Sequence, residues 1–308
     1  MSCRILLPQE LIDSIIDYTH DDPTTLKSCA LVSCAWLPAS RYHLFRSVSV
    51  RLTDGPYHYH ANPPPGGVAH SLYRIVLSSP EIAWYIRDLV ICKGSPLIWM
   101  SHDEFLPPLL RMLTNLRRLE FEPLPPRGVF GQWPGHLIDS ICTARCLPSI
   151  TELVLFNLSF DNQAHLRRMF RLFPALKTLQ LQEVMFVMEV DDDDMVYRRD
   201  KEKDDGDIVT ATQRTRLDIL SVDSPHSLDV TECLLHPQSP IDLTGIYRLN
   251  LLMWVAANPS ARLLRSTPCL ERLEVDLKCG EFFSVYPTPH MLMVPRHLGG
   301  TRRTRHQS

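Results

Sequence analysis

One spaced pattern of apolar positions, L-x-x-L-x-L with Ile, Val or Phe replacing some of the Leu, recurs seven times along the chain. In four of the seven copies the last four positions alternate between polar and apolar, as in a short strand with one buried face. Successive copies begin 30, 34, 26, 41, 29 and 24 residues apart, which leaves room for a return segment after each strand. The copies occupy residues 86–91, 116–121, 150–155, 176–181, 217–222, 246–251 and 270–275.

The return segments predict helices. Asp161 can cap a helix on which Leu166 and Phe173 share one apolar face, and residues 103–113 and 136–147 have a similar pattern. A strand in each copy and a helix in each return predict an α/β fold of parallel strands with helical returns. Each unit buries its apolar face only against its neighbours.

The repeated motif resembles the core of a leucine-rich repeat. The resemblance implies an irregular solenoid over residues 70–286, which offers a protein-binding face. Two features depart from that family, because the spacing is uneven and the consensus Asn or Cys is absent. The alternative is an ordinary α/β layer whose strands happen to begin L-x-x-L. The positions eight residues after the first Leu hold Leu124, Leu158, Val184, Pro225, Trp254 and Lys278.

The first fifty residues predict three short helices and a strand. Apolar side chains within residues 11–16 form one broad helical stripe. Asp22 followed by Pro23 marks a helix start, because Asp accepts free backbone N–H groups and proline loses no donor there. Pro38 opens a third helix, and residues 48–52 alternate as a strand does.

Three helices in about forty residues bury too little apolar surface to be stable by themselves. Leaving several Leu or Ile side chains exposed is costly, because each contributes about 1.5–3 kcal/mol when buried. Two arrangements answer this. Either the helices pack as a small cap on the rest of the chain, or their apolar face binds a second protein.

The sequence motifs of this N-terminal block resemble a second family. L-P-x-E-L-I at residues 7–12, Asp22-Pro23, C-A-L-V-S-x-A-W at 29–36 and H-L-F-R at 43–46 resemble an F-box, and residues 31–45 are particularly similar to F-box proteins of mushroom-forming fungi. In that family the motif binds the Skp adaptor and, through it, cullin in a ubiquitin ligase. Each carried-over position is alternatively a plain core residue. The adaptor-binding candidates are Leu7, Pro8, Leu11, Ile15, Leu31, Val32, Trp36 and Leu44.

The two resemblances together imply the substrate-recognition subunit of a Skp–cullin–F-box ubiquitin ligase, which binds an unknown protein substrate and catalyses nothing itself. The alternative is a non-catalytic F-box and repeat scaffold that binds proteins without a role in ubiquitination. Substrate contacts are expected from side chains on the concave strands. The candidates are Arg117, Arg118, Glu152, Lys177, Gln180, Asp218, Arg272 and Glu274.

The domain organisation follows from these patterns. We expect a small N-terminal three-helix F-box at 1–50, a linker or loop at 51–69 and the repeat region at 70–286. Residues 189–207 hold ten acids and four bases and predict a solvated, flexible insertion, with a contact for a basic substrate as the alternative. Residues 287–308, which are rich in Pro, Gly and Arg, predict a disordered tail.

Composition narrows the class further. A net charge of −3 and a pI near 6.5 argue against a nucleic-acid partner. Most of the nine cysteines lie in apolar runs, which favours reduced thiols in the cytoplasm or nucleus. The N-terminus lacks the features of a signal peptide, and the longest apolar run, 251–257, is shorter than the ~20 residues of a membrane helix. We therefore expect no membrane partner.

No sequence motif points to catalysis. The chain has no Gly-rich phosphate loop, no G-x-S-x-G and no H-E-x-x-H. Cys142, Cys146, His136 and His165 are spaced too loosely for a zinc site. We predict no enzyme, no cofactor and no metal. A deep polar pocket with paired His and carboxylate groups would favour an enzyme instead.

Overall fold

The structure is a computed structural model. No helix among the residues that it describes is both long enough and apolar enough to cross a membrane. The described residues are 7–52, 67–93, 105–123, 131–132, 147–160, 162–186, 214–223, 227–254 and 260–278. The predicted acidic insertion at 189–207, the predicted tail at 287–308 and residues 53–66 of the predicted linker therefore lie outside them.

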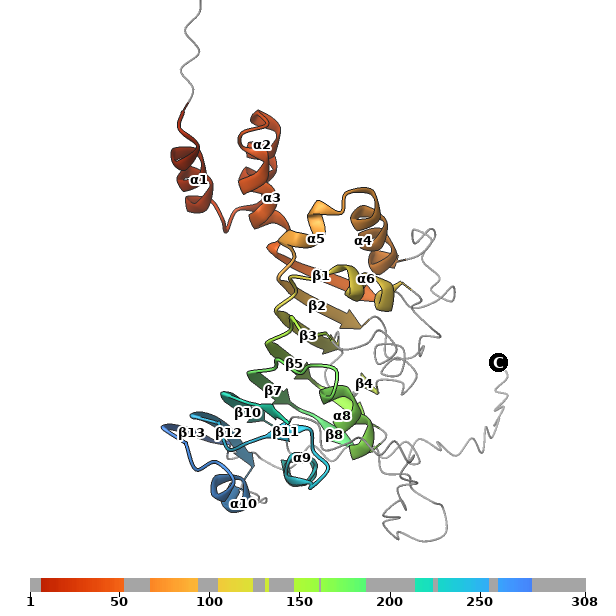
Figure 1. The fold of residues 1–308 in the computed structure, drawn as a ribbon, viewed down its shortest axis with the longest axis vertical. Coiled ribbons are helices and arrows are strands. Elements are labelled where there is room, and N and C mark those ends of the chain that lie inside the picture. The colour runs from red at the N-terminus through yellow and green to blue at the C-terminus, as the bar shows by residue number, and fades with distance from the viewer. Residues whose placement is uncertain are drawn as a thin grey trace, which may run out of the picture. The chain divides into compact units, whose positions relative to one another are not determined.

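A parallel sheet of eight strands forms the centre of the described chain (Figure 1). Its order follows the sequence, β1-β2-β3-β5-β7-β10-β12-β13, and every pairing in it is parallel. The predicted α/β class with parallel strands is confirmed. The strands are β1 Ser47–Leu52, β2 Asp88–Lys93, β3 Arg118–Pro123, β5 Glu152–Phe156, β7 Thr178–Gln182, β10 Ile219–Asp223, β12 Arg248–Trp254 and β13 Arg272–Lys278.

The repeated motif sets the register of this sheet. The fourth and sixth positions of each copy align across neighbouring strands as two apolar rows, and they join one hydrophobic core. At the last strand, β13, Leu273 and Val275 remain 44% and 47% exposed, because no further described strand covers them. The first row is Val48, Leu89, Leu119, Leu153, Leu179, Leu220, Leu249 and Leu273, and the second is Val50, Ile91, Phe121, Leu155, Leu181, Val222, Leu251 and Val275.

Strand β1 is an eighth copy of the motif that the spaced-Leu search missed. Phe45, Val48 and Val50 occupy the three apolar positions, and Phe45 packs against the main core. The last helix of the N-terminal block therefore runs directly into the sheet. The linker expected at 51–69 does not separate that block from the sheet, because β1 already pairs with β2.

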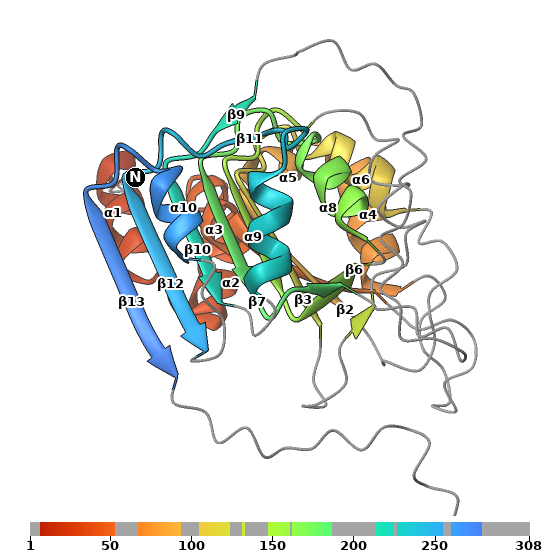
Figure 2. The ribbon, with the colours of Figure 1, turned by 90° about the horizontal axis from the view of Figure 1, so that it is seen from below.

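Helices supply the other side of the core. Buried side chains of α4, α6, α8, α9 and α10 join the strand rows in a single cluster. Figure 2 shows α8 and α9 on one side of the strands. Asn162, rather than the expected Asp161, caps α8 by accepting the His165 backbone N–H at 2.9 Å. These helices are α4 Gly67–Ser78, α5 Glu81–Tyr85, α6 Leu106–Met112, α8 Gln163–Phe170, α9 Ser227–Leu235 and α10 Ser260–Arg265. There are also two small sheets among the described residues. One contains β4 Gly131–Gln132, β6 Leu158–Phe160 and β8 Met185–Phe186, and the other pairs β9 Thr215–Arg216 with β11 Ile241–Asp242.

The residue just before each strand forms a repeated backbone ladder. Its N–H donates to the carbonyl of the corresponding residue in the preceding unit, as from Arg87 to Arg46 at 2.9 Å and from Arg117 to Arg87 at 2.7 Å. The ladder continues through Thr151, Lys177, Asp218, Tyr247 and Glu271. Because Arg46 ends helix α3, the ladder also joins the N-terminal helices to the sheet.

Three helices form the N-terminal block, and they share a small core of their own. They are α1 Gln9–Tyr18, α2 Pro23–Val32 and α3 Leu37–Arg46. Ile12 and Ile16 of α1 and Leu26 of α2 are buried together and are covered by partly buried Trp36, Ala39 and Leu44. Three fully buried side chains are a very small core, as the length of the block predicts.

Candidate functional site

The N-terminal block exposes large apolar side chains on the side away from its core. Leu7, Leu11, Ile15 and Tyr18 are spaced at three or four residues and follow one side of α1, while Ile12 and Ile16 point inward. Leu31 and Val32 end α2 and are 87% and 64% exposed. We call these six exposed residues, Leu7, Leu11, Ile15, Tyr18, Leu31 and Val32, the helical apolar face.

The structure divides the eight adaptor-binding candidates into two groups. Leu7, Pro8, Leu11, Ile15, Leu31 and Val32 are exposed, whereas Trp36 and Leu44 pack on the small core. Tyr18, which is 91% exposed, was missed although its spacing from Ile15 continues the α1 stripe. The Gln9 side chain donates to the Ala35 carbonyl at 3.0 Å. This bond holds the start of α1 against the loop after α2, so both parts of the face belong to one folded unit.

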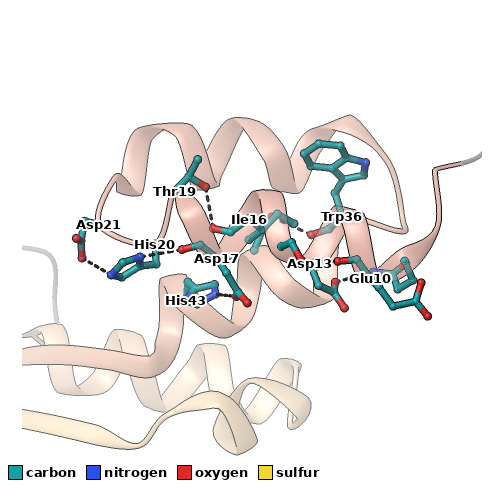
Figure 3. A network of polar contacts seen from close by, with 12 residues as sticks. Glu10, Asp13, Ile16, Asp17, Thr19, His20, Asp21, Trp36 and His43 are labelled. Atoms are coloured by element: carbon teal, nitrogen blue, oxygen red, sulfur yellow. Dashed lines mark hydrogen bonds and ion pairs between the residues drawn. The ribbon is translucent and has the colours of Figure 1, made fainter.

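Polar contacts join α1 to α3 and hold the turn after α1 (Figure 3). The His43 ring lies 2.7 Å from an Asp17 carboxylate oxygen, and the His20 ring lies 2.8 Å from the Asp17 carbonyl and 3.0 Å from Asp21. The His20 and His43 ring centroids are 6.1 Å apart. Pairs this close to solvent each stabilise only weakly, by about 0–1 kcal/mol. Their role is to orient α1 rather than to supply most of the stability.

Helix α2 begins as its sequence predicts. Asp22 Oδ1 accepts the Thr24 and Thr25 backbone N–H groups at 2.9 and 3.2 Å, and Oδ2 accepts the Thr25 hydroxyl at 2.6 Å. The hydroxyl bond from Thr25, together with these backbone bonds, holds the pKa of the Asp22 carboxyl below its usual value. The charged carboxylate is therefore the form that caps the helix.

The Asp22→Ala variant should unfold at a lower temperature than the wild type at pH 7, because three donors lose their acceptor. A carboxyl with a lowered folded-state pKa stabilises above its unfolded pKa and loses that contribution as the pH falls through the folded value. The difference between variant and wild type should therefore shrink in acid. Thermal unfolding followed by circular dichroism measures it. Asp21→Ala removes the same charge from a 91% exposed side chain that caps nothing, and an equal effect there would contradict the capping role.

The strand face that the helices leave uncovered carries polar side chains in two networks. Arg118 donates to Glu152 at 2.7 Å and to Glu120 at 2.9 Å, and Gln180 donates to Glu152 at 3.4 Å. Partial burial lowers the pKa of Arg118, but the hydrogen bond to Glu120 and the charges of Glu152, Glu120 and Asp88 outweigh it and raise that pKa. Arg118, Glu152 and Gln180 thus satisfy one another before any partner binds.

The second network lies on β12 and β13. Glu274 accepts from Arg248 at 3.2 Å and pairs with Arg272. The hydrogen bond from Arg248, followed by the charges of both arginines, holds the pKa of the Glu274 carboxyl below its usual value despite some desolvation. The other three substrate candidates, Arg117, Lys177 and Asp218, were expected on strands but lie one residue before a strand, and they belong to neither network.

The described residues hold no group of three or more His, Cys, Asp and Glu side chains that could bind a metal ion. Cys142, Cys146 and His136 lie outside the described part of the chain, and His165 lies on α8. The chain matches none of the protein-family models and none of the curated proteins with which it was compared. The candidate site is therefore defined by its surfaces: an apolar helical face and a polar strand face.

Proposed function

We propose that the chain is the substrate-recognition subunit of a Skp–cullin–F-box ubiquitin ligase. Helices α1–α3 are the F-box and bind the Skp adaptor, and the strands belong to a leucine-rich-repeat-like solenoid that binds a protein substrate. The observation that carries this proposal is the helical apolar face. Six large apolar side chains, 44–91% exposed, surround a core of only three buried residues.

Energetics support a partner on this face. Completing the burial of one such side chain contributes up to about 1.5–3 kcal/mol, so six of them offer a large gain on association. The alternative, in which the block hides its apolar surface against the rest of the chain, is not favoured, because these six residues stay exposed beside the sheet. The resemblance of residues 7–46 to the F-box motif supports the Skp adaptor as the proposed partner.

The proposed mechanism is proximity. A receptor that holds adaptor and substrate together raises the local concentration of the substrate near a ubiquitin-loaded enzyme and supplies no reacting group. The direct passage from α3 to β1, together with the Arg87 to Arg46 hydrogen bond, supports this role, because it gives the two binding surfaces a short and ordered connection.

The deciding experiment uses isothermal titration calorimetry to measure the binding of the purified chain to a purified fungal Skp adaptor. We expect a one-to-one complex with a Kd below about 1 μM, which corresponds to roughly 8 kcal/mol. Absence of binding at concentrations tenfold higher would refute the F-box assignment. A complex that binds cullin but supports no ubiquitin transfer to any captured protein would instead favour the scaffold function.

A further inference from the structure

The residues that immediately precede the first five strands of the sheet are mostly basic. They are Arg46, Arg87, Arg117, Thr151 and Lys177, in the order β1, β2, β3, β5 and β7. The same position in the remaining three strands holds Asp218, Tyr247 and Glu271. At the position just before each strand, the cations are thus confined to the first five strands. We call Arg46, Arg87, Arg117 and Lys177 the basic rim.

The backbone ladder places these residues in a line. Hydrogen bonds of 2.9, 2.7, 2.9 and 2.8 Å join Arg46, Arg87, Arg117, Thr151 and Lys177 in succession. All the strands begin at this edge of the sheet and run away from it (Figure 2). Neighbouring strands lie about 4.8 Å apart, so the four intervals span roughly 19 Å.

The charges of the basic rim are available to a ligand. Arg46, Arg117 and Lys177 are exposed, and their side chains have no partner among the described residues. The Arg87 guanidinium lies over the Tyr42 ring, 5.4 Å from its centroid, a contact that orients the group without neutralising it. The carboxylates of Glu120 and Glu152, on the next rows of the face, already accept from Arg118.

We propose that the basic rim binds a short acidic segment of a partner protein, one rich in Asp and Glu or phosphorylated. The inference rests on the proposed function, since it names the class of substrate that the strand region captures. An extended peptide advances about 3.3 Å per residue, so about six residues cover the rim. Arginines in a row suit carboxylate and phosphate groups because the guanidinium can donate two parallel hydrogen bonds to either.

A nucleic acid fits this surface less well. A polyanion that continued along the edge would meet Asp218 and Glu271, and the chain as a whole carries a net charge of −3. Proteins that bind nucleic acids usually present a basic patch or stripe along a whole face, and here the basic residues stop at Lys177. The geometry therefore points to a ligand that is both short and acidic.

The test uses the full-length chain and fluorescence anisotropy with four labelled probes. These are a twelve-residue peptide containing six consecutive glutamates, the same peptide with three phosphoserines among glutamines, an all-glutamine version, and a single-stranded oligonucleotide of six phosphates. We expect binding of one or both acidic peptides, weakened by added salt, and none of the all-glutamine peptide. The tighter acidic peptide identifies carboxylate or phosphate as the preferred group. Oligonucleotide binding as tight as either acidic peptide would overturn the inference.

The paired variants Arg117→Ser and Lys177→Ser, combined in one chain, should weaken acidic-peptide binding about tenfold, as expected for the loss of two exposed charged contacts. Arg74→Ser with Arg265→Ser removes the same charge from exposed positions on α4 and α10 and should change it little. Equal weakening by the two pairs would refute a localised rim. Adaptor binding is measured in parallel: its retention shows that the rim variant is folded, and its absence in the wild type would refute the F-box assignment without touching the rim.

Discussion

Replacing Leu31 with aspartate should weaken binding of the Skp adaptor by at least a hundredfold while the chain stays folded. Leu31 is 87% exposed, so a charge there costs the free protein little. In a complex the same position loses about 1.5–3 kcal/mol of apolar burial and must also desolvate a carboxylate. A hundredfold change corresponds to about 2.7 kcal/mol. Calorimetric titration of the variant with the adaptor measures it.

Leu77→Asp provides the matched control for this experiment. Leu77 is a 52% exposed leucine on α4, outside the helical apolar face, and its replacement should leave adaptor affinity unchanged.

Trp36→Ala addresses the other group of adaptor-binding candidates, those that pack on the small core. Because Trp36 covers Ile12, Ile16 and Leu26, its loss should lower the stability of the block. If Leu31→Asp binds the adaptor as tightly as the wild type does, the end of α2 is not part of the surface that binds the adaptor.

Truncation of Leu179 to alanine should lower the free energy of unfolding by about 2–5 kcal/mol. Leu179 is fully buried in β7, with Leu153 and Leu220 beside it in the same apolar row. The cavity cannot close easily, because both neighbouring strands hold their side chains in register. Equilibrium unfolding in urea gives the change from the shift of the transition midpoint.

Gln180→Ala is the control, since the next residue along β7 points to the uncovered face. Its side chain makes one long hydrogen bond, of 3.4 Å, to Glu152. We expect a change below about 1 kcal/mol, because this hydrogen bond is long and partly exposed and its acceptor, the Glu152 carboxylate, keeps its bond from Arg118. Similar losses in the two variants would mean that the inward and outward rows have been assigned the wrong way round.

The strand pattern could be found from sequence because the physics is local. Every second residue of each strand must be buried beside the equivalent residue of the neighbouring strand, so each strand shows the same motif. All seven copies form strands. The eighth copy was missed because it contains no Leu at its apolar positions, which are filled by Phe45 near the end of α3 and by Val48 and Val50 of β1. The same alternation at residues 48–52 predicted a strand, but only the pairing with β2 shows which sheet it joins.

The helical apolar face could be predicted from the sequence only in part. Leu11, Ile12, Ile15 and Ile16 are all apolar, so spacing alone cannot say which pair faces the core. That choice is made by α2 and α3, which cover Ile12 and Ile16 and leave the other two exposed. The basic rim was missed for a related reason. Its members are about thirty or more residues apart in sequence, and only the parallel register brings them into one line.

The uncovered side of β13 has a consequence for self-association. A strand edge with apolar residues as exposed as Leu273 and Val275 is a common starting point for fibres. If two copies of this protein paired β13 with β13 in antiparallel fashion along the full strand, Arg272 would oppose Lys278, and Glu274 would oppose Asp276. Like charges directly across a strand pair are destabilising. The charges of these four residues therefore discourage the chain from pairing with a second copy through β13, the edge where its core is least protected.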